Sequence, residues 1–166
     1  MKTIVLTGMM GSGKTTLGKL LGETLNMKFI DIDSSIELSE KSSIKNIFEI
    51  KGEKYFRELE KQTIKTIFKP EDLIIALGGG AFENNITRKF LLNNALIIYL
   101  KTTPQTIFDR IQNDTTRPLL CGKMNIEKIK EIIKIREKNY ESAHLTISTD
   151  NKTLEEIIEE ITGVLE

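Results

Sequence analysis

The sequence predicts an α/β fold in which a five-stranded parallel sheet is flanked by helices in three layers. Five short apolar segments alternate with longer amphipathic segments, which is the order of elements in βαβ units. The short segments lack a regular alternation of apolar and polar residues, as expected for strands that are buried on both faces. A glycine-rich loop joins the first strand to the first helix, a connection found in many such folds.

The expected strands define where a site would lie. They are Ile4 to Thr7, Lys28 to Ile32, Leu73 to Leu77, Ala95 to Leu100 and Leu145 to Ser148. Ligands of open parallel sheets bind beyond the carboxyl ends of the strands. The glycine loop, the stretch D-I-D, the triple glycine and a later polar loop are therefore expected to converge at one end of the sheet.

Apolar periodicity predicts the helices between these strands. The first carries a leucine stripe that begins at Leu17, and the others are Ser43 to Phe68 with a break near Gly52, Asn84 to about Leu92, a helix that opens with Thr103 and Pro104, about Asn125 to Ser142, and Leu154 to Leu165. No repeat or linker interrupts the order, so residues 1–166 are expected to form a single domain.

Charge and cysteine usage exclude several classes of protein. Lys plus Arg and Asp plus Glu number 24 each, which argues against a general nucleic-acid binder. Cys121 has no second cysteine to pair with, and His144 is the single histidine, so a Cys/His zinc cluster is excluded. We interpret His144 as structural. We expect a monomer in a reducing compartment, the cytoplasm, and no membrane span.

The stretch from Gly8 to Thr15, G-M-M-G-S-G-K-T, matches the phosphate-binding loop pattern G-x4-G-K-[ST] with a strand before it and a helix after it. Glycines allow backbone N–H groups to face one anion, and the positive end of the helix adds to the attraction. Lys14 is expected to reach the β- and γ-phosphates, and the Thr15 hydroxyl to ligate Mg²⁺. The predicted nucleotide contacts in this loop are Gly11, Ser12, Gly13, Lys14, Thr15 and Thr16.

Phosphate-binding loops occur in switches, motors and kinases, which other sequence features distinguish. A GTPase switch should carry N-K-x-D after a later strand, but this sequence has K-T-T-P-Q-T after the fourth strand and no N-K-x-D. A motor normally has a longer chain than these 166 residues. A small-molecule kinase needs a second pocket and a loop that closes over the phosphates.

Two acidic residues stand at the end of the second expected strand, in F-I-D-I-D. Because side chains alternate along a strand, Asp31 and Asp33 are expected to project to the same side, near the phosphate loop. One can support Mg²⁺ while the other accepts a hydrogen bond from a substrate hydroxyl. The alternative is a helix-entry turn, since D-S-S also suits an N-cap.

Three consecutive glycines, Gly78 to Gly80, follow the third expected strand. A run of glycines is costly in conformational entropy, so it indicates that the backbone comes close to a ligand. A tight loop is the alternative interpretation.

The helix before the last strand is expected to carry a cation on its inward face. Ile129, Ile132, Ile133, Arg136 and Tyr140 follow the spacing i, i+3, i+4, i+7, i+11. A cation on a buried stripe requires a partner, which is either an internal carboxylate or an anionic ligand.

Arg57 is a second candidate for anion binding. The apolar face of its helix is expected to comprise Phe56, Leu59, Thr63 and Ile67. A simple helix salt bridge is the alternative role, because Glu53 and Glu60 are within reach of Arg57. Together, Arg57 and Arg136 suggest a bidentate site for a carboxylate or a phosphate.

The polar loop D-T-T-R-P-L-L lies between two expected helices and contains Arg117. Such a loop can close over phosphates and exclude water, and Arg117 can neutralise charge in a transition state. The alternative is an ordinary connection between helices.

The ordered motifs G-M-M-G-S-G-K-T-T, D-I-D, F-R-E-L-E, G-G-G, R-P-L-L and R-x-x-x-Y resemble the shikimate kinase family, whose fold is the P-loop fold of nucleoside monophosphate kinases. The resemblance covers nearly the whole chain. It implies transfer of the γ-phosphoryl group of ATP to the 3-hydroxyl of shikimate with Mg²⁺, a step towards chorismate and the aromatic amino acids. It also implies a substrate-binding helical region at about 33–62 and a lid at about 112–124.

The resemblance implies a role for each matching residue. Lys14, Asp33 and Arg117 would be catalytic, Thr15 and Asp31 would hold the metal, Arg110 would stack on adenine, and the substrate would contact Asp33, Arg57, Gly79, Gly80, Arg136, Phe48 and Phe56. These roles agree with the interpretation of the residues themselves, because shikimate offers one carboxylate for the two arginines and three hydroxyls for the acidic pair.

Two stretches depart from the family pattern. Ala76 and Leu77 stand where the family often has Ser or Thr, so Mg²⁺ would rely more on Asp31. The stretch S-T-D-N-K-T replaces an Arg and a Pro of the adenine loop. A sibling kinase for another hydroxy acid such as gluconate, and a nucleotide-responsive binding protein without turnover, are the competing hypotheses.

Overall fold

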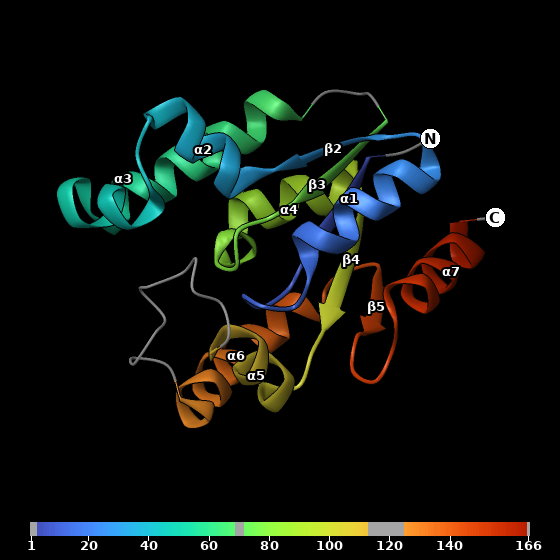
Figure 1. Ribbon diagram of the computed structural model, residues 1–166. Coiled ribbons are helices and arrows are strands. Elements are labelled where there is room, and N and C mark those ends of the chain that lie inside the picture. The colour runs from blue at the N-terminus through green and yellow to red at the C-terminus, as the bar shows by residue number, and fades with distance from the viewer. Residues whose placement is uncertain (1–2, 69–71, 113–124, 166) are drawn as a thin grey trace.

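A five-stranded parallel sheet forms the centre of the molecule (Figure 1). The computed structural model describes residues 3–68, 72–112 and 125–165. The strands are β1 (Ile4–Thr7), β2 (Lys28–Asp31), β3 (Leu73–Ala76), β4 (Leu96–Lys101) and β5 (Leu145–Ser148). They lie in the order β2-β3-β1-β4-β5, with every neighbouring pair parallel. The predicted fold class is confirmed.

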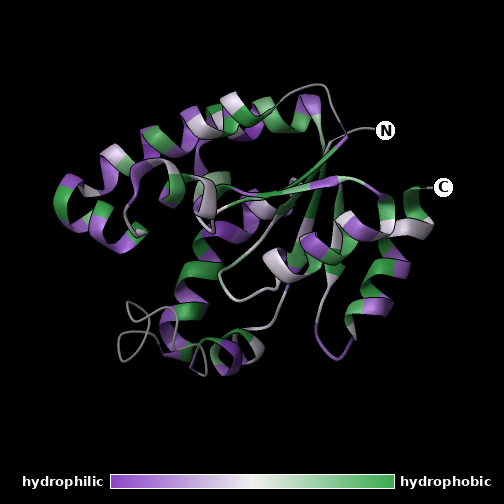
Figure 2. Cartoon of the chain, turned by 45° about the horizontal axis from the view of Figure 1, so that its top comes forward, coloured by the Kyte–Doolittle hydropathy of each residue, from purple (hydrophilic) through white to green (hydrophobic). Residues whose placement is uncertain are grey.

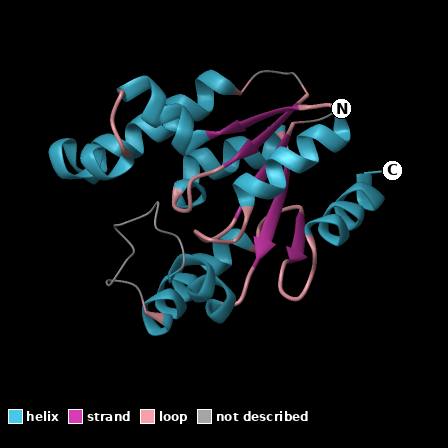
Figure 3. Cartoon of the chain, viewed as in Figure 1, coloured by secondary structure: helices cyan, strands magenta, loops and turns pink. Residues whose placement is uncertain are grey.

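Helices cover both faces of this sheet (Figure 3). The apolar residues of α1 (Lys14–Leu25) and α7 (Leu154–Leu165) pack on one face, with Ile4, Leu6 and Ile98. The other face is covered by α2 (Ile32–Glu40), α3 (Ile44–Ile67), α4 (Asn85–Asn94), α5 (Pro104–Gln112) and α6 (Ile126–Tyr140). Figure 2 shows the central strands as largely hydrophobic and the helices as striped, as expected when helices bury one face.

The order of the strands places the candidate site. β1 lies between β3 and β4, so the chain winds outward from it in both directions. A ligand crevice in such a sheet forms where the winding reverses, beyond the carboxyl end of the strand. The predicted phosphate loop follows β1 and the triple glycine follows β3. Both loops therefore lie at the expected place.

The second strand is one residue shorter than predicted, and this changes the geometry of the acidic pair. Asp31 is the last strand residue, and its Oδ1 accepts a hydrogen bond from the backbone N–H of Ser34 at 3.0 Å. Asp31 thereby caps α2, and Asp33 lies in the first turn of that helix. The expectation that both carboxylates project to one side of a strand is wrong; the helix entry is what forms.

The long third helix bends where the sequence predicts. Gly52 has φ 80° and ψ 166°, which interrupts α3, and the Ser43 side chain accepts from the N–H of Asn46 at its start. A positive φ of this size suits glycine, which has no Cβ to clash. In the described parts of the chain, no helix combines the length and apolarity that a bilayer crossing requires.

Candidate active site

The loop between β1 and α1 has the backbone conformation of an anion cradle. Gly8, Gly11 and Gly13 have φ of 141°, 74° and 93°, and α1 begins at Lys14. Only glycine adopts these values without steric strain. The Lys14 ammonium lies over the loop, where it donates to the carbonyl oxygens of Gly8 at 2.9 Å and Met9 at 2.8 Å.

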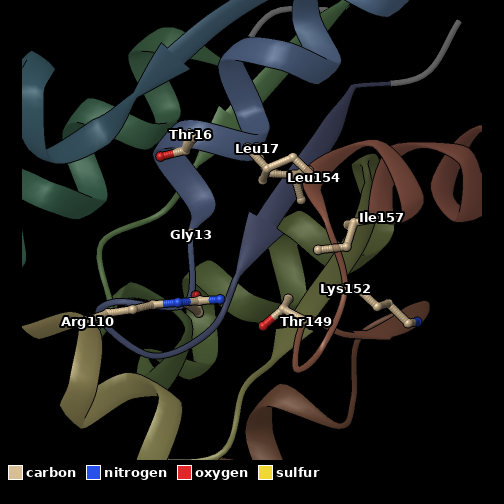
Figure 4. Close-up of a pocket in the computed structure, with 9 residues that line it drawn as sticks. Gly13, Thr16, Leu17, Arg110, Thr149, Lys152, Leu154 and Ile157 are labelled. Atoms are coloured by element: carbon tan, nitrogen blue, oxygen red, sulfur yellow. The ribbon is translucent and has the colours of Figure 1, made fainter.

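A pocket opens beside this loop (Figure 4). Its lining comes from the loop and α1, from α5, from the segment between β5 and α7, and from α7 itself: Ser12, Gly13, Thr16, Leu17, Arg110, Thr149, Lys152, Leu154 and Ile157. The Ser12 hydroxyl is buried and has no hydrogen-bond partner among the described residues. Nη1 of Arg110 donates to the carbonyl oxygen of Gly11 at 3.1 Å, which fixes the guanidinium at the pocket. A buried hydroxyl beside a cradle of N–H groups fits a phosphate-bearing ligand.

Two oxygen ligands for a cation meet at the start of α1. The Thr15 hydroxyl donates to Oδ2 of Asp31 at 2.7 Å. A hydroxyl and a carboxylate are hard oxygen donors, which Mg²⁺ prefers. The described residues include no group of three or more His, Cys, Asp or Glu side chains around a point. This donor set therefore fits a cation that takes its remaining ligands from phosphates and water.

Charged side chains from α2 and α3 lie against the triple glycine. A Cβ on Gly78 would lie 2.6 Å from Oδ1 of Asp33 and 2.8 Å from Oε1 of Glu60. A Cβ on Gly80 would lie 2.7 Å from Nη2 of Arg57. These three side chains belong to α2 and α3, and none of the three glycines has a positive φ. The glycines are needed for space rather than for an unusual backbone conformation.

Arg136 reaches the same loop from α6. Its Nη1 donates to the carbonyl oxygen of Gly79 at 2.8 Å, and the Tyr140 hydroxyl donates to the same oxygen at 2.5 Å. A Cβ on Gly79 would also lie 3.4 Å from the backbone N of Met10 in the phosphate loop. The predicted inward position of Arg136 is confirmed, and this part of the site adjoins the nucleotide loop.

Arg57 is held by acidic and aromatic neighbours. Its Nη1 donates to Oε2 of Glu60 at 2.9 Å, so the helix salt bridge considered from the sequence exists. The guanidinium also lies over the rings of Phe56 and Phe48, at 5.3 Å and 6.0 Å from their centroids. Burial alone would lower the pKa of Arg57, but the charge and hydrogen bond of Glu60 and the charge of Glu53 raise it. The guanidinium therefore stays charged and oriented.

Glu60 belongs to the site, whereas the sequence suggests for it only a salt bridge with Arg57. It is only 3% exposed, and it shares the buried face of α3 with Phe56 and Ile64. The predicted face, which included Leu59 and Thr63, is therefore displaced by about one residue. Burial raises the pKa of Glu60, and the nearby charge of Arg57 opposes this rise. The spacing i, i+4, i+8 of the three buried residues was the available signal.

The structure brings most of the predicted residues into two adjoining groups. Gly11, Ser12, Gly13, Thr16 and Arg110 belong to the first, with Lys14, Thr15 and Asp31 at its rim, and Asp33, Arg57, Arg136 and the triple glycine form the second. Arg117 and Cys121 and the predicted lid lie largely or wholly in 113–124, outside the described residues. His144 has a structural partner, because its Nδ1 accepts from the N–H of Ile97 at 3.0 Å.

Comparison with known proteins gives consistent matches. The family model described as shikimate kinase matches residues 10–166. A shikimate kinase of Sulfurihydrogenibium sp. (strain YO3AOP1) is 47% identical over 161 residues, which cover 97% of this chain and 96% of the relative. The solved shikimate kinase from Acinetobacter baumannii in complex with shikimate has a TM-score of 0.93 at 34% identity, with 99% of this chain and 93% of that chain covered. A gluconokinase from Sinorhizobium meliloti 1021 shares the fold, with a TM-score of 0.59 at 16% identity over 99% of this chain and 91% of that one.

Proposed function

The chain belongs to the shikimate kinase family, and we propose that it transfers the γ-phosphoryl group of ATP to the 3-hydroxyl of shikimate. One observation carries this proposal: Asp33, Arg57 and Arg136 meet at the triple glycine, next to the phosphate loop. An acid, two guanidinium groups and a close backbone suit an acceptor that has both a carboxylate and hydroxyls.

The acceptor binds through its two kinds of polar group. Arg57 and Arg136 hold the carboxylate, since a carboxylate is a stronger acceptor for a guanidinium than the carbonyl oxygen that Arg136 contacts. Gly79 and Gly80 approach the hydroxylated ring through their backbone, and Phe48 and Phe56 supply the apolar wall beside Arg57.

ATP binds along the loop between β1 and α1. The loop N–H groups and Lys14 hold the phosphates, while Arg110 contacts the base in the pocket of Figure 4. Thr15 and Asp31 would hold Mg²⁺, which when bound neutralises charge on the phosphates. Arg117 is proposed to add positive charge from a lid at about 112–124.

In the transfer step the 3-hydroxyl oxygen attacks the γ-phosphorus. A new P–O bond forms, and the bond to the β–γ bridging oxygen breaks, so ADP leaves with that electron pair. Asp33 accepts the hydroxyl's hydrogen bond and takes its proton as the bond forms. Lys14 stabilises the negative charge that develops on the leaving oxygen.

We also propose that residues 1–166 act as one monomeric domain in the cytoplasm, with a substrate-binding helical region at about 33–62. The single cysteine supports a reducing compartment. Gel filtration with light scattering at several protein concentrations tests the monomer.

The activity is tested by measuring ADP release from Mg·ATP with shikimate, with gluconate as the matched hydroxy acid, and with no acceptor. Shikimate alone is expected to stimulate release strongly. Stimulation by gluconate instead would replace the acceptor while keeping the nucleotide site. Binding of ATP without stimulation by either acid would favour a nucleotide-responsive binding protein.

A further inference from the structure

Asp150 joins two segments that line the nucleotide pocket. It lies in the connection between β5 and α7, immediately after Thr149. Its Oδ1 accepts from the hydroxyls of Thr103 at 2.8 Å and Thr106 at 2.6 Å, and its Oδ2 accepts from the N–H of Thr103 at 3.0 Å. Three donors from the start of α5 thus converge on one carboxylate. We call this arrangement the Asp150 clamp.

A second contact reinforces the clamp where the two strands end. The hydroxyls of Thr102 and Thr149 are 2.6 Å apart, and both residues are buried. The N–H of Thr149 donates to the carbonyl oxygen of Lys101 at 2.9 Å, which continues the β4–β5 pairing up to the clamp. The relative position of α5 and the β5–α7 segment is therefore fixed by buried and charge-assisted hydrogen bonds.

The clamp is linked through α5 to the nucleotide loop. Arg110 lies one helical turn after Thr106, so the two residues share a face of α5. Arg110 lines the pocket and donates to the Gly11 carbonyl, while Thr149 and Lys152 line it from the segment that carries Asp150 (Figure 4). The side chain of Lys152 is held on α7 by an ion pair with Glu160. A shift of α5 away from Asp150 would separate these two linings of the pocket.

The charge of Asp150 is matched to this role. Burial alone would raise its pKa, but the hydrogen bonds from Thr106 and Thr103 and the charge of Arg110 lower it. The carboxylate is therefore ionised at neutral pH. It accepts hydrogen bonds from the threonine hydroxyls more strongly than a neutral amide would.

We propose that Asp150 is a positioning residue for nucleotide binding, which sets the distance between Arg110 and the β5–α7 segment through Thr103 and Thr106. It touches no reacting atom, so it acts through other residues. Removing it should weaken binding of ATP and leave binding of the acid acceptor unchanged. If the clamp were merely structural, its removal would lower stability without weakening ATP binding more than acceptor binding. The inference rests on the proposed function for the identity of the pocket's ligand.

The test compares Asp150→Ala, Asp150→Asn and Thr106→Val with the wild-type protein, and uses Glu155→Gln on the exposed start of α7 as the control for charge. Initial rates are measured with ATP varied at saturating shikimate, and then with shikimate varied at saturating ATP. ATP binding is also titrated calorimetrically with no acid present, so that it is measured even when the acceptor assignment fails. Melting temperatures report folding.

Asp150→Ala is expected to raise the KM for ATP and the calorimetric Kd about tenfold, with the KM for shikimate within about twofold of the wild-type value. Asp150→Asn should give a KM for ATP and a Kd between those of the wild type and Asp150→Ala, because it keeps one oxygen acceptor. Combining Asp150→Ala with Thr106→Val should add little to Asp150→Ala alone, since both remove the same contact. If Asp150→Ala does not fold, Asp150→Asn and Thr106→Val decide by the same criterion.

Equal increases in both KM values would overturn the proposal, as would a folded Asp150→Ala protein with unchanged ATP binding. If shikimate stimulates ADP release in neither the wild type nor any variant, the assignment of shikimate as the acceptor is refuted instead. The calorimetric titration would then still support or refute the clamp.

Discussion

Replacing Gly78 with alanine tests whether the triple glycine makes room for the side chains of Asp33, the proposed base, and Glu60. The new Cβ would lie 2.6 Å from Oδ1 of Asp33 and 2.8 Å from Oε1 of Glu60, whereas ordinary contact begins at 3.4 Å. Both oxygens must therefore retreat by roughly 0.6 to 0.8 Å. Gly78 does not have a positive φ, so backbone strain does not contribute.

The expected loss follows from these distances. Displacing a catalytic group by about 1 Å can cost about 100-fold in rate, so we expect kcat to fall by roughly 30- to 100-fold. Overpacking should also cost about 1–3 kcal/mol of the free energy of unfolding. Steady-state rates of ADP release give kcat, and urea unfolding gives the stability.

Two other glycine-to-alanine substitutions distinguish the steric overlap at Gly78 from a general effect of introducing alanine. Gly79→Ala should be milder, because its nearest contact is 3.4 Å. Gly163→Ala in α7 meets no atom within 4 Å and should stabilise the protein by about 1 kcal/mol without changing kcat. A Gly78→Ala protein with wild-type kcat and stability would refute the steric argument.

Three further predictions concern the same site. Arg136→Ala should raise the KM for shikimate at least about tenfold while the KM for ATP stays almost unchanged, because a charge-assisted contact is lost; equal loss of ATP affinity would contradict the assignment. Tyr140→Phe removes one of two donors to the Gly79 carbonyl and should lower the free energy of unfolding by about 1–2 kcal/mol, with a several-fold higher KM for shikimate. Glu60→Gln should gain stability relative to the wild type as pH rises above 4.5 in urea unfolding series, because a raised folded-state pKa gives stability that is lost as pH rises through it; a constant difference from pH 4 to 8 would contradict this.

The strands and most helices could be predicted because each has a strong local signal. β5 and α7 begin and end at the predicted residues, and the break at Gly52 forms as expected. A buried parallel strand is a short apolar run, and a helix that packs on a sheet has a regular apolar stripe. Both patterns can be read without knowledge of tertiary contacts.

The positions of Asp31 and Asp33 could not be settled in this way. The stretch F-I-D-I-D fits a strand, and D-S-S fits the start of a helix, so two local signals overlap. The structure resolves the overlap through the Asp31 cap, which ends the strand one residue earlier. Consequently Asp31 contacts Thr15 while Asp33 lies beside Gly78, and the two acids serve different parts of the site.

Partners that are distant in sequence were also beyond prediction. The buried stripe of its helix predicts that Arg136 needs a carboxylate or an anionic ligand, but no local pattern identifies the Gly79 carbonyl, which lies 57 residues away, as its partner. Asp150 meets Thr103 and Thr106 only because β4 and β5 are neighbours in the sheet. The family resemblance concerned substrate contacts, so it did not point to residues that act through other residues.

The two glycine clusters of the site illustrate why residue type alone leaves the physical reason open. Gly13 has φ 93°, and a Cβ there would meet no atom nearer than 3.9 Å, so alanine would fit in space but strain the backbone by about 1–2 kcal/mol. Gly78 has the opposite problem, since its backbone suits any residue but the space is taken by Asp33 and Glu60. It follows that shortening the obstructing side chains could rescue Gly78→Ala, whereas no change in a neighbouring side chain relieves a positive φ. Because Asp33 is the proposed base, we expect that rescue to restore stability and leave the protein inactive.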